Sequence, residues 1–409
     1  MLFLIYINDL PDNLESVVKL FADDTSTYLS LEDVDQRSFI LNSDLTKITE
    51  WAKKWKVDFN PTKTELMTLS TKTLPRTLPI KFDNTTLTET NKHKHLGVIL
   101  QNDCKWNFHI QSIISKVRLH IACFKSLKYR LSRKALEIIY KTCILPHFDY
   151  ADVLWDNCTL ALSEELEQLN LDAIRTVIGA VRGTSHQKLY DESGMTPLVE
   201  RRRRHKLTLY YKIINGYAPG YLNEYIPPLI TEINPYHRRN LLDRYLPRCR
   251  TELYKQSFFP SVTAAWNAIP DEAKRLKSIL QFKKYLSSND QTVPLFFYSH
   301  NRISEIIHCR LRLEISDLNA DLFQRHLKED KSCECGYREE NAKHYLIDCP
   351  RHVYARTLSL HLLTNYDELQ IHCLLHGDNR LSIAENRAIF DRVHEFIELS
   401  NRFSLLYKK

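Results

Sequence analysis

The sequence predicts an α+β segment at the N-terminus, followed by a mainly α-helical remainder that holds a small cysteine- and histidine-containing unit. Short aliphatic and aromatic runs separated by turn formers fill most of the first 104 residues, as expected of strands and hairpins. Apolar residues then recur at three- and four-residue steps, as expected of helices. Three cysteines and a histidine lie close together near the C-terminus.

Composition narrows the class of protein. With 409 residues, 43% of them hydrophobic and 26% charged, the chain can bury two or three cores, as globular proteins do. Only 8 residues are glycine, and neither GxGxxG nor GxxxxGK followed by Ser or Thr occurs, which excludes the usual nucleotide-cradling loops. The ten cysteines stand mostly alone, and the opening lacks the basic residues of a secretory leader. We expect reduced thiols and an intracellular protein, nuclear or cytoplasmic, with no membrane partner.

The first elements are predicted to be strands. Residues 2–7 and 17–21 are aliphatic and aromatic, and the turn formers NDLPDN lie between them. The run VVKLF-ADD-TSTYLS predicts a β-hairpin that carries Asp23 and Asp24 at its tip. Because the chain begins inside an apolar run, we expect that something upstream is missing.

A helix is predicted next, over residues 34–55, where Ile48, Trp51 and Trp55 belong to a run of apolar residues at helical spacing. The elements predicted after it are a turn at Asn60–Pro61 and strands over 65–70, 78–88 and 94–100.

From residue 105 onward the chain is predicted to be mainly helical, with amphipathic stretches over 108–127, 132–155, 162–180 and 196–216. Residues 217–250 form a connector rich in proline, tyrosine and arginine. We therefore divide the chain into four predicted segments: 1–104, 105–180, 181–300 and 301–409.

The adjacent carboxylates of Asp23 and Asp24 call for an explanation, because like charges repel and the flanking strands are largely apolar. One explanation is a simple turn, since aspartate is common there. The other is that the pair binds Mg²⁺, an ion that prefers carboxylate oxygens and that can activate a hydroxyl and stabilise a leaving pyrophosphate.

These residues resemble the reverse transcriptases of non-LTR retrotransposons (LINE type, jockey-like) around the catalytic hairpin, which there carries Tyr or Phe followed by Ala-Asp-Asp. Here it is Phe21-Ala22-Asp23-Asp24. The resemblance continues in order through WAKKWKVDFNPTKTELMTLS, HKHLGVIL and LPHFDYADVLW, and then through SFFPSVTAAWNAIP and HCRLRLEISDLNADLF. It covers essentially the whole chain.

The resemblance implies an RNA-directed DNA polymerase, a nucleotidyltransferase that uses Mg²⁺, an RNA template and a DNA primer or target. Asp23 and Asp24 would bind the catalytic Mg²⁺. Lys63 would protonate the leaving pyrophosphate, unless it is only a solvated lysine beside a turn. Leu96 and Gly97 would form the primer grip, unless the HLGVIL run is an ordinary edge strand. Residues 1–104 would be the second half of the palm and 105–180 the thumb.

The resemblance also implies that parts are missing. Family members carry a further palm aspartate and a fingers region before the stretch at which this chain starts. Asp9 and Asp12 are the acidic residues upstream of Glu15, and both lie in a turn-like loop. We therefore expect an N-terminally truncated polymerase that is inactive alone, or one completed by a longer transcript or a partner chain. A decayed element without a selected role is a further alternative.

The cysteine-histidine cluster reads C-x-C-x(8)-H-x(4)-C and offers Zn²⁺ a tetrahedral set of three thiolates and one imidazole. The alternative is a set of unconnected thiols and an exposed histidine, and His308 and His352 are substitute ligands. As a zinc knuckle the unit would contact nucleic acid through Tyr337, Tyr345 and Arg351, or it would only staple a small helical domain. The predicted ligands are Cys333, Cys335, His344 and Cys349.

A basic run, RRRRHK, lies in a segment, residues 201–250, that holds eleven Lys and Arg against three Asp and Glu. One interpretation of this run is that it contacts the phosphates of a nucleic acid. The alternatives are a solvated helix face and a nuclear-import signal. The alternative function is therefore a non-catalytic remnant that binds RNA or single-stranded DNA. Its predicted contacts are Arg201, Arg202, Arg203, Arg204, Lys206, Arg238 and Arg239, with Arg244, Arg248 and Arg250 nearby.

Overall fold

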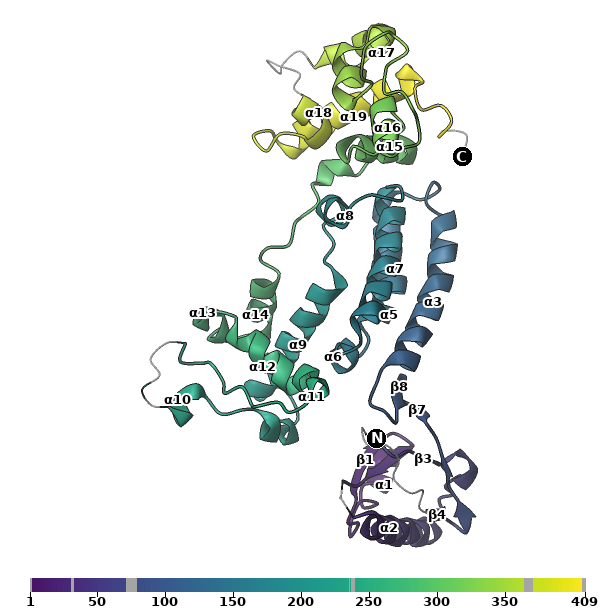
Figure 1. Cartoon of the computed structure of the whole chain (residues 1–409), viewed down its shortest axis with the longest axis vertical. Helices are drawn as coiled ribbons and strands as arrows, with labels where there is room; N and C mark the ends of the chain where they lie inside the picture. The colour runs from purple at the N-terminus through teal and green to yellow at the C-terminus, as the bar shows by residue number, and fades with distance from the viewer. Residues whose placement is uncertain are drawn as a thin grey trace. The chain divides into compact units, whose positions relative to one another are not determined.

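The computed structural model describes residues 2–30, 33–70, 79–234, 236, 240–363 and 371–406. The chain divides into two compact units, Met1–Gln111 and Ser112–Lys409, which we describe separately (Figure 1). In the described part of the chain, no helix combines the length and the apolar character that crossing a bilayer requires.

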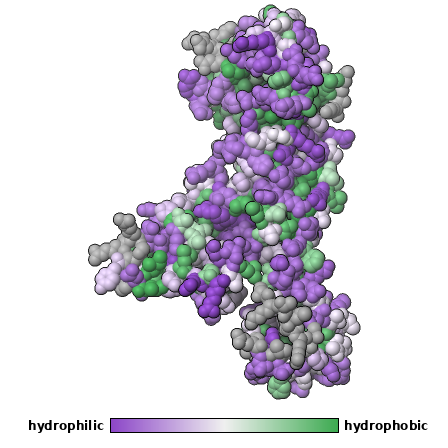
Figure 2. Space-filling view, in the orientation of Figure 1, coloured by the Kyte–Doolittle hydropathy of each residue, from purple (hydrophilic) through white to green (hydrophobic). Residues whose placement is uncertain are grey.

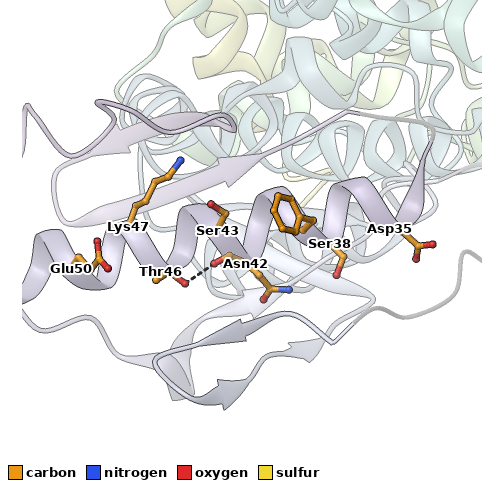
Figure 3. A pocket seen from close by; sticks show the side chains of 8 residues that line it. Asp35, Ser38, Asn42, Ser43, Thr46, Lys47 and Glu50 are labelled. Carbon is orange, nitrogen blue, oxygen red and sulfur yellow. Dashed lines mark hydrogen bonds between the residues drawn. The ribbon is translucent and has the colours of Figure 1, made fainter.

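The first unit is built on one long helix, α2 (Val34–Trp55), whose bounds confirm the prediction. The Asp33 side chain caps it by accepting hydrogen bonds from two backbone N–H groups of the first turn. One face of α2 carries Ile48 into a small core with Leu10 and Phe82. The opposite face is polar and borders a shallow hollow of about 670 Å³ that only α2 residues line (Figure 3). The helix is thus amphipathic, as its sequence spacing indicates.

The strands of the first unit form four two-stranded sheets. Three are antiparallel and one is parallel, and the predicted strands over 65–70 and 78–88 are present only as two-residue pieces within those ranges. The pairs are β1 (Val17–Phe21) with β2 (Asp24–Tyr28), β3 (Glu65–Leu66) with β6 (Thr88–Glu89), β4 (Lys81–Phe82) with β5 (Thr85–Thr86), and β7 (Lys92–His95) with β8 (Val98–Gln101).

The prediction of a strand over residues 2–7 is wrong, because Leu2–Tyr6 form the short helix α1. Among the described residues no strand pairs with this segment. A lone strand would leave its N–H and C=O groups without partners, whereas a helix satisfies part of them internally. Leu2, Leu4 and Ile5 remain exposed on α1.

The second unit is almost entirely helical. The predicted helix over 132–155 is divided by a π-helical turn, Tyr140–Ile144, and by Pro146, which supplies no N–H to a helix. Its helices up to the connector are α3 (Asn107–Ser126), α4 (Arg133–Ile139), α5 (Leu145–Asp149), α6 (Asp152–Trp155), α7 (Leu160–Ile178), α8 (His186–Ser193) and α9 (Leu198–Ile214). Those that follow are α10 (Ile230–Ile233), α11 (Glu252–Gln256), α12 (Phe258–Asn267), α13 (Asp271–Lys274), α14 (Ile279–Leu286), α15 (Arg302–Arg312), α16 (Asn319–Gln324), α17 (Val353–Leu358), α18 (Ile371–His376) and α19 (Ile383–Ser400).

Among the described residues, the apolar clusters of this unit include the following two. One lies between α9, α12 and α14, where the rings of Tyr211 and Phe282 stack with centroids 4.6 Å apart. The other lies among the helices from α15 to α19 and includes Phe390 and Phe396 of α19.

Arginines of α15 join the second core to the helices before it. The Arg302 guanidinium donates to the carbonyl oxygens of Thr176 and Val177, in the last turn of α7, where carbonyls lack helical partners. Arg310 donates through Nε to the carbonyl of Gly179 at 3.0 Å. Gly179 ends α7 at φ +83°, and a Cβ there would lie 2.5 Å from Ile306 of α15. The approach of α15 therefore requires glycine at this position.

A buried carboxylate completes this junction. Glu192 of α8 accepts hydrogen bonds from Arg133 of α4, at 2.9 Å, and from Arg312 of α15, at 2.7 and 3.1 Å. Burial disfavours the charged form of Glu192, but Arg312 and Arg133 outweigh that effect and hold the pKa of the carboxyl below its ordinary value. The carboxylate therefore remains ionised between two buried cations.

We expect Glu192→Gln to lower the free energy of unfolding by about 3 kcal/mol, because it removes the counter-charge of buried Arg312 and one of the two carboxylates that pair with buried Arg133, the other being Glu137. Since the pKa of Glu192 is lowered on folding, its contribution is full above pH 4.5 and is lost as the pH falls through the folded-state pKa. Urea titrations over this pH range measure both effects.

Glu314→Gln is the matched control for Glu192→Gln. Glu314 also pairs with a cation, Lys188, but its side chain is 72% exposed, and exposed pairs contribute only about 0–1 kcal/mol. Equal losses in the two variants would contradict the role assigned to Glu192.

Candidate functional site

The two adjacent aspartates lie at the tip of the β1–β2 hairpin. Phe21 pairs with Asp24, so that Ala22 and Asp23 form the two-residue turn. Ala22 has φ +53°, in the left-handed region that a tight hairpin turn requires. Asp23 and Asp24 are both exposed. The structure thus presents both carboxylates at the end of a hairpin.

A buried carboxylate of α2 anchors the start of this hairpin. Asp44 accepts hydrogen bonds from the backbone N–H groups of Glu15 and Ser16, at 3.0 and 2.7 Å, immediately before β1. Burial favours the neutral acid, but the hydrogen bonds from Ser16 and Glu15 outweigh it and lower the pKa of Asp44. The hairpin therefore extends from a fixed point on α2.

The two faces of the hairpin differ. Leu20 packs toward the core of the first unit. Val17, Phe21 and Tyr28 lie on the other face, because side chains alternate along a strand, and they are 43, 62 and 52% exposed. Asp24 shares this face, since it lies directly opposite Phe21. Lys19 lies on this face as well, so the acidic tip is the end of an exposed face that mixes apolar and polar residues.

Among the described residues, no third Asp, Glu, His or Cys groups with Asp23 and Asp24 at metal-ligand distances. Asp9 is engaged elsewhere, because its Oδ1 accepts a hydrogen bond from the indole of Trp51 at 2.9 Å. The hairpin therefore offers carboxylates from a single turn.

The other predicted catalytic residues lie on separate turns of the first unit. Lys63 is exposed at the end of a short 3-10 turn, Pro61–Lys63, which the Asn60 side chain caps. Leu96 and Gly97 form the turn between β7 and β8, with φ of +45° and +85°. The predicted strand over 94–100 is thus a hairpin. A leucine in the left-handed region costs of order 1 kcal/mol, and such strain is common at functional turns.

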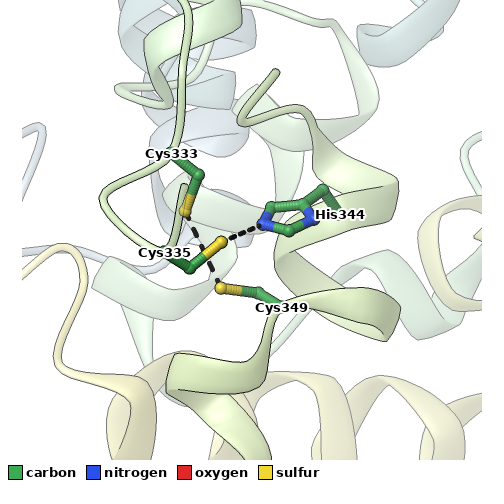
Figure 4. Close-up of side chains that lie close together, drawn as sticks. All are labelled: Cys333, Cys335, His344 and Cys349. Atoms are coloured by element: carbon green, nitrogen blue, oxygen red, sulfur yellow. Dashed lines mark hydrogen bonds between the residues drawn. The ribbon is translucent and has the colours of Figure 1, made fainter. Parts of the chain in front are cut away.

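The four predicted metal ligands come together in the second unit. The sulfur atoms of Cys333, Cys335 and Cys349 and a ring nitrogen of His344 all lie within 4.8 Å of one another (Figure 4). Cys333 and Cys335 belong to a turn that Gly336, at φ +90°, allows. His344 begins a π-helical turn, His344–Asp348, which Cys349 ends. This Cys/His group can bind a metal ion.

The spacing of these atoms fits a tetrahedral centre. The sulfurs of Cys333 and Cys349 are 3.8 Å apart, and Cys335 Sγ is 3.3 Å from His344 Nε2. In a zinc tetrahedron with bonds of about 2.3 Å to sulfur and about 2.0 Å to nitrogen, these separations are about 3.8 and 3.5 Å. Burial lowers the pKa of His344, which favours the neutral ring that binds metals. The group thus has the donors and the geometry for zinc.

The substitute ligands and most of the predicted nucleic-acid contacts are committed elsewhere. Buried His308 hydrogen-bonds to His394 and to the carbonyl of Leu374, and His352 is not part of the group. The prediction that Tyr345 contacts nucleic acid is wrong, because this residue is buried and its hydroxyl bonds to Ser400. Arg351 is paired with Glu334. Tyr337 is half-exposed, with its ring stacked on that of His344 at 4.4 Å.

The basic run lies on α9, where the structure corrects the predicted role of several cations. Arg202 is 3% exposed and donates to Asp156 at 2.7 Å, and Lys206 is buried beside the same carboxylate at 2.6 Å. Burial removes both from the predicted set of phosphate contacts. Their neighbours are paired as well: Arg201 with Asp149, Arg203 with Glu200, and Arg204 with Glu200 and Asp290.

The partners of α9 are acidic residues of the FDYADVLWD stretch, which sequence reasoning did not identify. Asp149, Asp152 and Asp156 are spaced at helical steps of three and four, and they face Arg201, His205 and Arg202. Burial raises the pKa of Asp152, although its bond to His205 at 2.6 Å opposes this effect. The acidic residues of the FDYADVLWD stretch and the cations of α9 recur at similar helical steps, and this match is the signal from which their pairing could have been predicted.

Asp149, Asp152 and His205 could in principle hold a metal ion. Both oxygens of Asp149, however, accept hydrogen bonds from Arg201, and Asp152 and His205 are bonded to each other. The cluster is therefore satisfied as an ion-pair ladder between α5, α6 and α9.

The remaining predicted cations belong to the connector. Arg238 and Arg239 lie outside the described residues. Arg244 donates to the carbonyl of Pro227 at 2.7 Å, within the connector itself. Arg248 and Arg250 are exposed.

Comparison with known proteins finds relatives of this chain. The chain is similar to the probable RNA-directed DNA polymerase from transposon X-element of Drosophila melanogaster, with 25% identity over 260 residues, or 58% of this chain and 28% of that protein. It is similar to the probable RNA-directed DNA polymerase from transposon BS of the same species, with 24% identity over 50% of this chain and 24% of that protein. It also resembles the RNA-directed DNA polymerase from mobile element jockey of Drosophila funebris, with 24% identity over 41% of this chain and 18% of that protein.

These matches confirm the resemblance to jockey-like reverse transcriptases of non-LTR retrotransposons. The chain spans about a quarter of the length of these curated relatives. No family model matches it.

We expect Arg202→Ala to lower the free energy of unfolding by about 3 kcal/mol, because it leaves the Asp156 carboxylate with one cation fewer in a largely buried network. The neighbouring Arg203→Ala changes a 40% exposed side chain and should cost less than about 1 kcal/mol. Thermal or urea unfolding of the two variants compares them directly. If Arg202→Ala leaves stability unchanged but weakens RNA binding, the predicted phosphate contact is restored.

Proposed function

We propose that this chain is part of an RNA-directed DNA polymerase of the jockey-like non-LTR type, and that it carries the catalytic hairpin and the helical thumb. The observation that carries the proposal is the pair of exposed carboxylates, Asp23 and Asp24, at the tip of a hairpin in a chain whose relatives are named as such polymerases. Residues 1–104 are then part of the palm.

In this proposal Asp23 and Asp24 hold divalent cations, and Mg²⁺ is the ion that suits carboxylate oxygens and phosphate substrates. Bound Mg²⁺ would activate the primer hydroxyl and stabilise the leaving pyrophosphate. Leu96 and Gly97, on the strained turn between β7 and β8, position the primer, and the exposed amine of Lys63 is the proton donor. The ligands of the polymerase are an RNA template and a DNA primer or target.

The chain is proposed to need a complementary polypeptide for catalysis. Two metal ions require more carboxylates than a single turn supplies, and no further ligand groups with Asp23 and Asp24 in the described residues. The face of the hairpin beside them exposes the apolar side chains of Phe21 and Tyr28. Exposed apolar residues of α1 also line a hollow of about 690 Å³ with Trp55. A partner segment that covers this side and adds a carboxylate would complete the palm.

We expect the chain to bind Mn²⁺, used as a paramagnetic substitute for Mg²⁺, with an affinity on the order of millimolar, because only one turn supplies ligands. Asp23→Asn/Asp24→Asn should weaken binding at least about tenfold. Asp83→Asn is the control, since Asp83 is another exposed aspartate at a hairpin turn of the same unit. Water-proton relaxation measures the bound ion, and equal binding by all three proteins contradicts the assignment.

Primer extension tests the need for a partner. On a primed RNA template with Mg²⁺, neither the chain nor its Asp23→Asn/Asp24→Asn variant should add nucleotides. Extension by the unchanged chain but not by the variant would show that the carboxylates act without a partner. That result would overturn the requirement for a second polypeptide and keep the polymerase assignment.

The Cys/His group is proposed to hold a structural Zn²⁺ through Cys333, Cys335, His344 and Cys349. The sulfur and nitrogen separations support this ion. A structural role is favoured over contact with nucleic acid because Tyr345 is buried and the charge of Arg351 is paired with Glu334. The remnant that would bind nucleic acid through this unit and the RRRRHK run therefore has less support than the polymerase.

We expect the purified chain to hold one zinc ion and Cys349→Ser to lose it, whereas Cys123→Ser, at an exposed cysteine of α3, retains it. Burial raises the pKa of Cys333 to about 12, so zinc must displace protons and its affinity should rise with pH. Atomic absorption and a chelator competition between pH 6 and 8 provide the measurement. A Cys349→Ser variant that still holds one zinc ion per chain would contradict the assignment of these four residues as zinc ligands.

A further inference from the structure

The connector after α9 forms an extended surface that the polymerase assignment does not explain. It includes a 3-10 turn, Gly220–Tyr225, the short helix α10 and the helix α11 that precedes α12. Figure 1 shows the chain returning from α10 along α12 to α11. Figure 2 shows that the surface over this part of the molecule mixes hydrophobic and hydrophilic residues.

Tyrosine rings dominate what this surface exposes. Six tyrosines in the connector and α11 are between 46 and 87% exposed, although they carry large, partly apolar rings. Exposed aromatic rings in such number mark a recognition surface rather than a solvated loop. They are Tyr217, Tyr221, Tyr225, Tyr236, Tyr245 and Tyr254.

Local contacts hold the ring of one of these tyrosines and the backbone of two others. Tyr225 stacks on Phe259 of α12, with centroids 5.3 Å apart and planes at 25°, which leaves its other face outward. The backbone N–H of Tyr245 donates to the carbonyl of Pro228 at 2.9 Å. Tyr254 lies in α11, where its N–H is capped by the side chain of Thr251. The rings are therefore presented on an ordered backbone.

Two arginines accompany the rings. Leu229 and Arg244 form an antiparallel bridge. In an antiparallel pair the residues before one strand residue lie on the same side as the residues after its partner. Tyr225 and Arg248 are therefore found toward the same end of this bridge. Arg248 and Arg250 are exposed, and no carboxylate pairs with either among the described residues. The arginines of α9 are instead paired. The connector therefore has two exposed cations available to an anionic ligand.

We propose that this surface binds single-stranded RNA, with bases stacked on Tyr225, Tyr245 and Tyr254 and phosphates paired with Arg248 and Arg250. Stacking on tyrosine requires unpaired bases, because the faces of paired bases are covered within a duplex. The inference rests on the proposed function for the choice of RNA, since a template is the single strand that such a polymerase must hold. It moves the predicted nucleic-acid contact from the RRRRHK helix to the connector.

The test is fluorescence anisotropy of the full chain with a labelled single-stranded RNA of about 20 nucleotides, longer than one such surface covers. Tyr225→Leu/Tyr245→Leu/Tyr254→Leu keeps apolar contacts but removes the rings, and it should weaken binding at least about fivefold per ring at every salt concentration. Arg248→Gln/Arg250→Gln should reduce the slope of log affinity against log salt by about 0.7 per arginine. Circular dichroism confirms that the variants fold.

Tyr354→Leu/Arg392→Gln is the control, because it removes an exposed tyrosine of α17 and a partly exposed arginine of α19 that pairs with Glu395. It should leave affinity and salt slope unchanged. Affinity that is equal in the tyrosine variant and the unchanged chain overturns the proposal. Equal affinity for single-stranded and duplex RNA also overturns the proposal, since such binding reflects phosphate contact alone. A chain that binds no RNA and captures a protein partner overturns it as well.

The RNA-binding test and the metal-binding test of the polymerase assignment can fail independently of each other. Loss of RNA binding in the tyrosine variant supports the surface even if Asp23→Asn/Asp24→Asn leaves Mn²⁺ binding unchanged. Conversely, intact metal binding at the hairpin with unaltered RNA affinity in the tyrosine variant contradicts this inference alone.

Discussion

The second unit depends on one buried carboxylate between two buried guanidinium groups. Glu192 accepts hydrogen bonds from Arg133 and from Arg312, which belong to helices that are far apart in sequence. A charge buried in this way is stable only while its partners remain. The contact therefore fixes α8, α4 and α15 to one another. Because α15 begins the region that contains the Cys/His group, that region is part of the helical body rather than an appended module.

The same principle governs the other cations of this unit. A sequence rich in arginine suggests a surface for polyanions, yet Arg302 and Arg310 cap the carbonyl end of α7 and Arg202 lies beside Asp156. Arginine suits these positions because its planar group donates several hydrogen bonds at once. Net charge in a stretch of sequence thus says little about free charge on the surface until each cation has been matched to its partner.

Local patterns were predicted well, and contacts between distant residues were not. The bounds of α2 and the β1–β2 hairpin follow from spacing and from turn residues close in sequence. The four metal-binding side chains follow from a motif of seventeen residues. The pairing of Asp149 with Arg201 spans 52 residues and depends on how α5 and α9 pack. The strand expected at residues 2–7 is a helix because no described strand lies beside it.

The charged groups that do not serve packing are then the best guide to the chemistry of the protein. Most charged side chains of α9 and α15 have partners, so they serve packing. The carboxylates at the hairpin tip have no third ligand beside them among the described residues, and Leu96 adopts a left-handed backbone conformation in the turn between β7 and β8. In the connector, Arg248 and Arg250 are exposed, as are several tyrosine rings of the same segment. The exposed carboxylates and arginines do not serve packing, and they are the groups on which the two proposals depend.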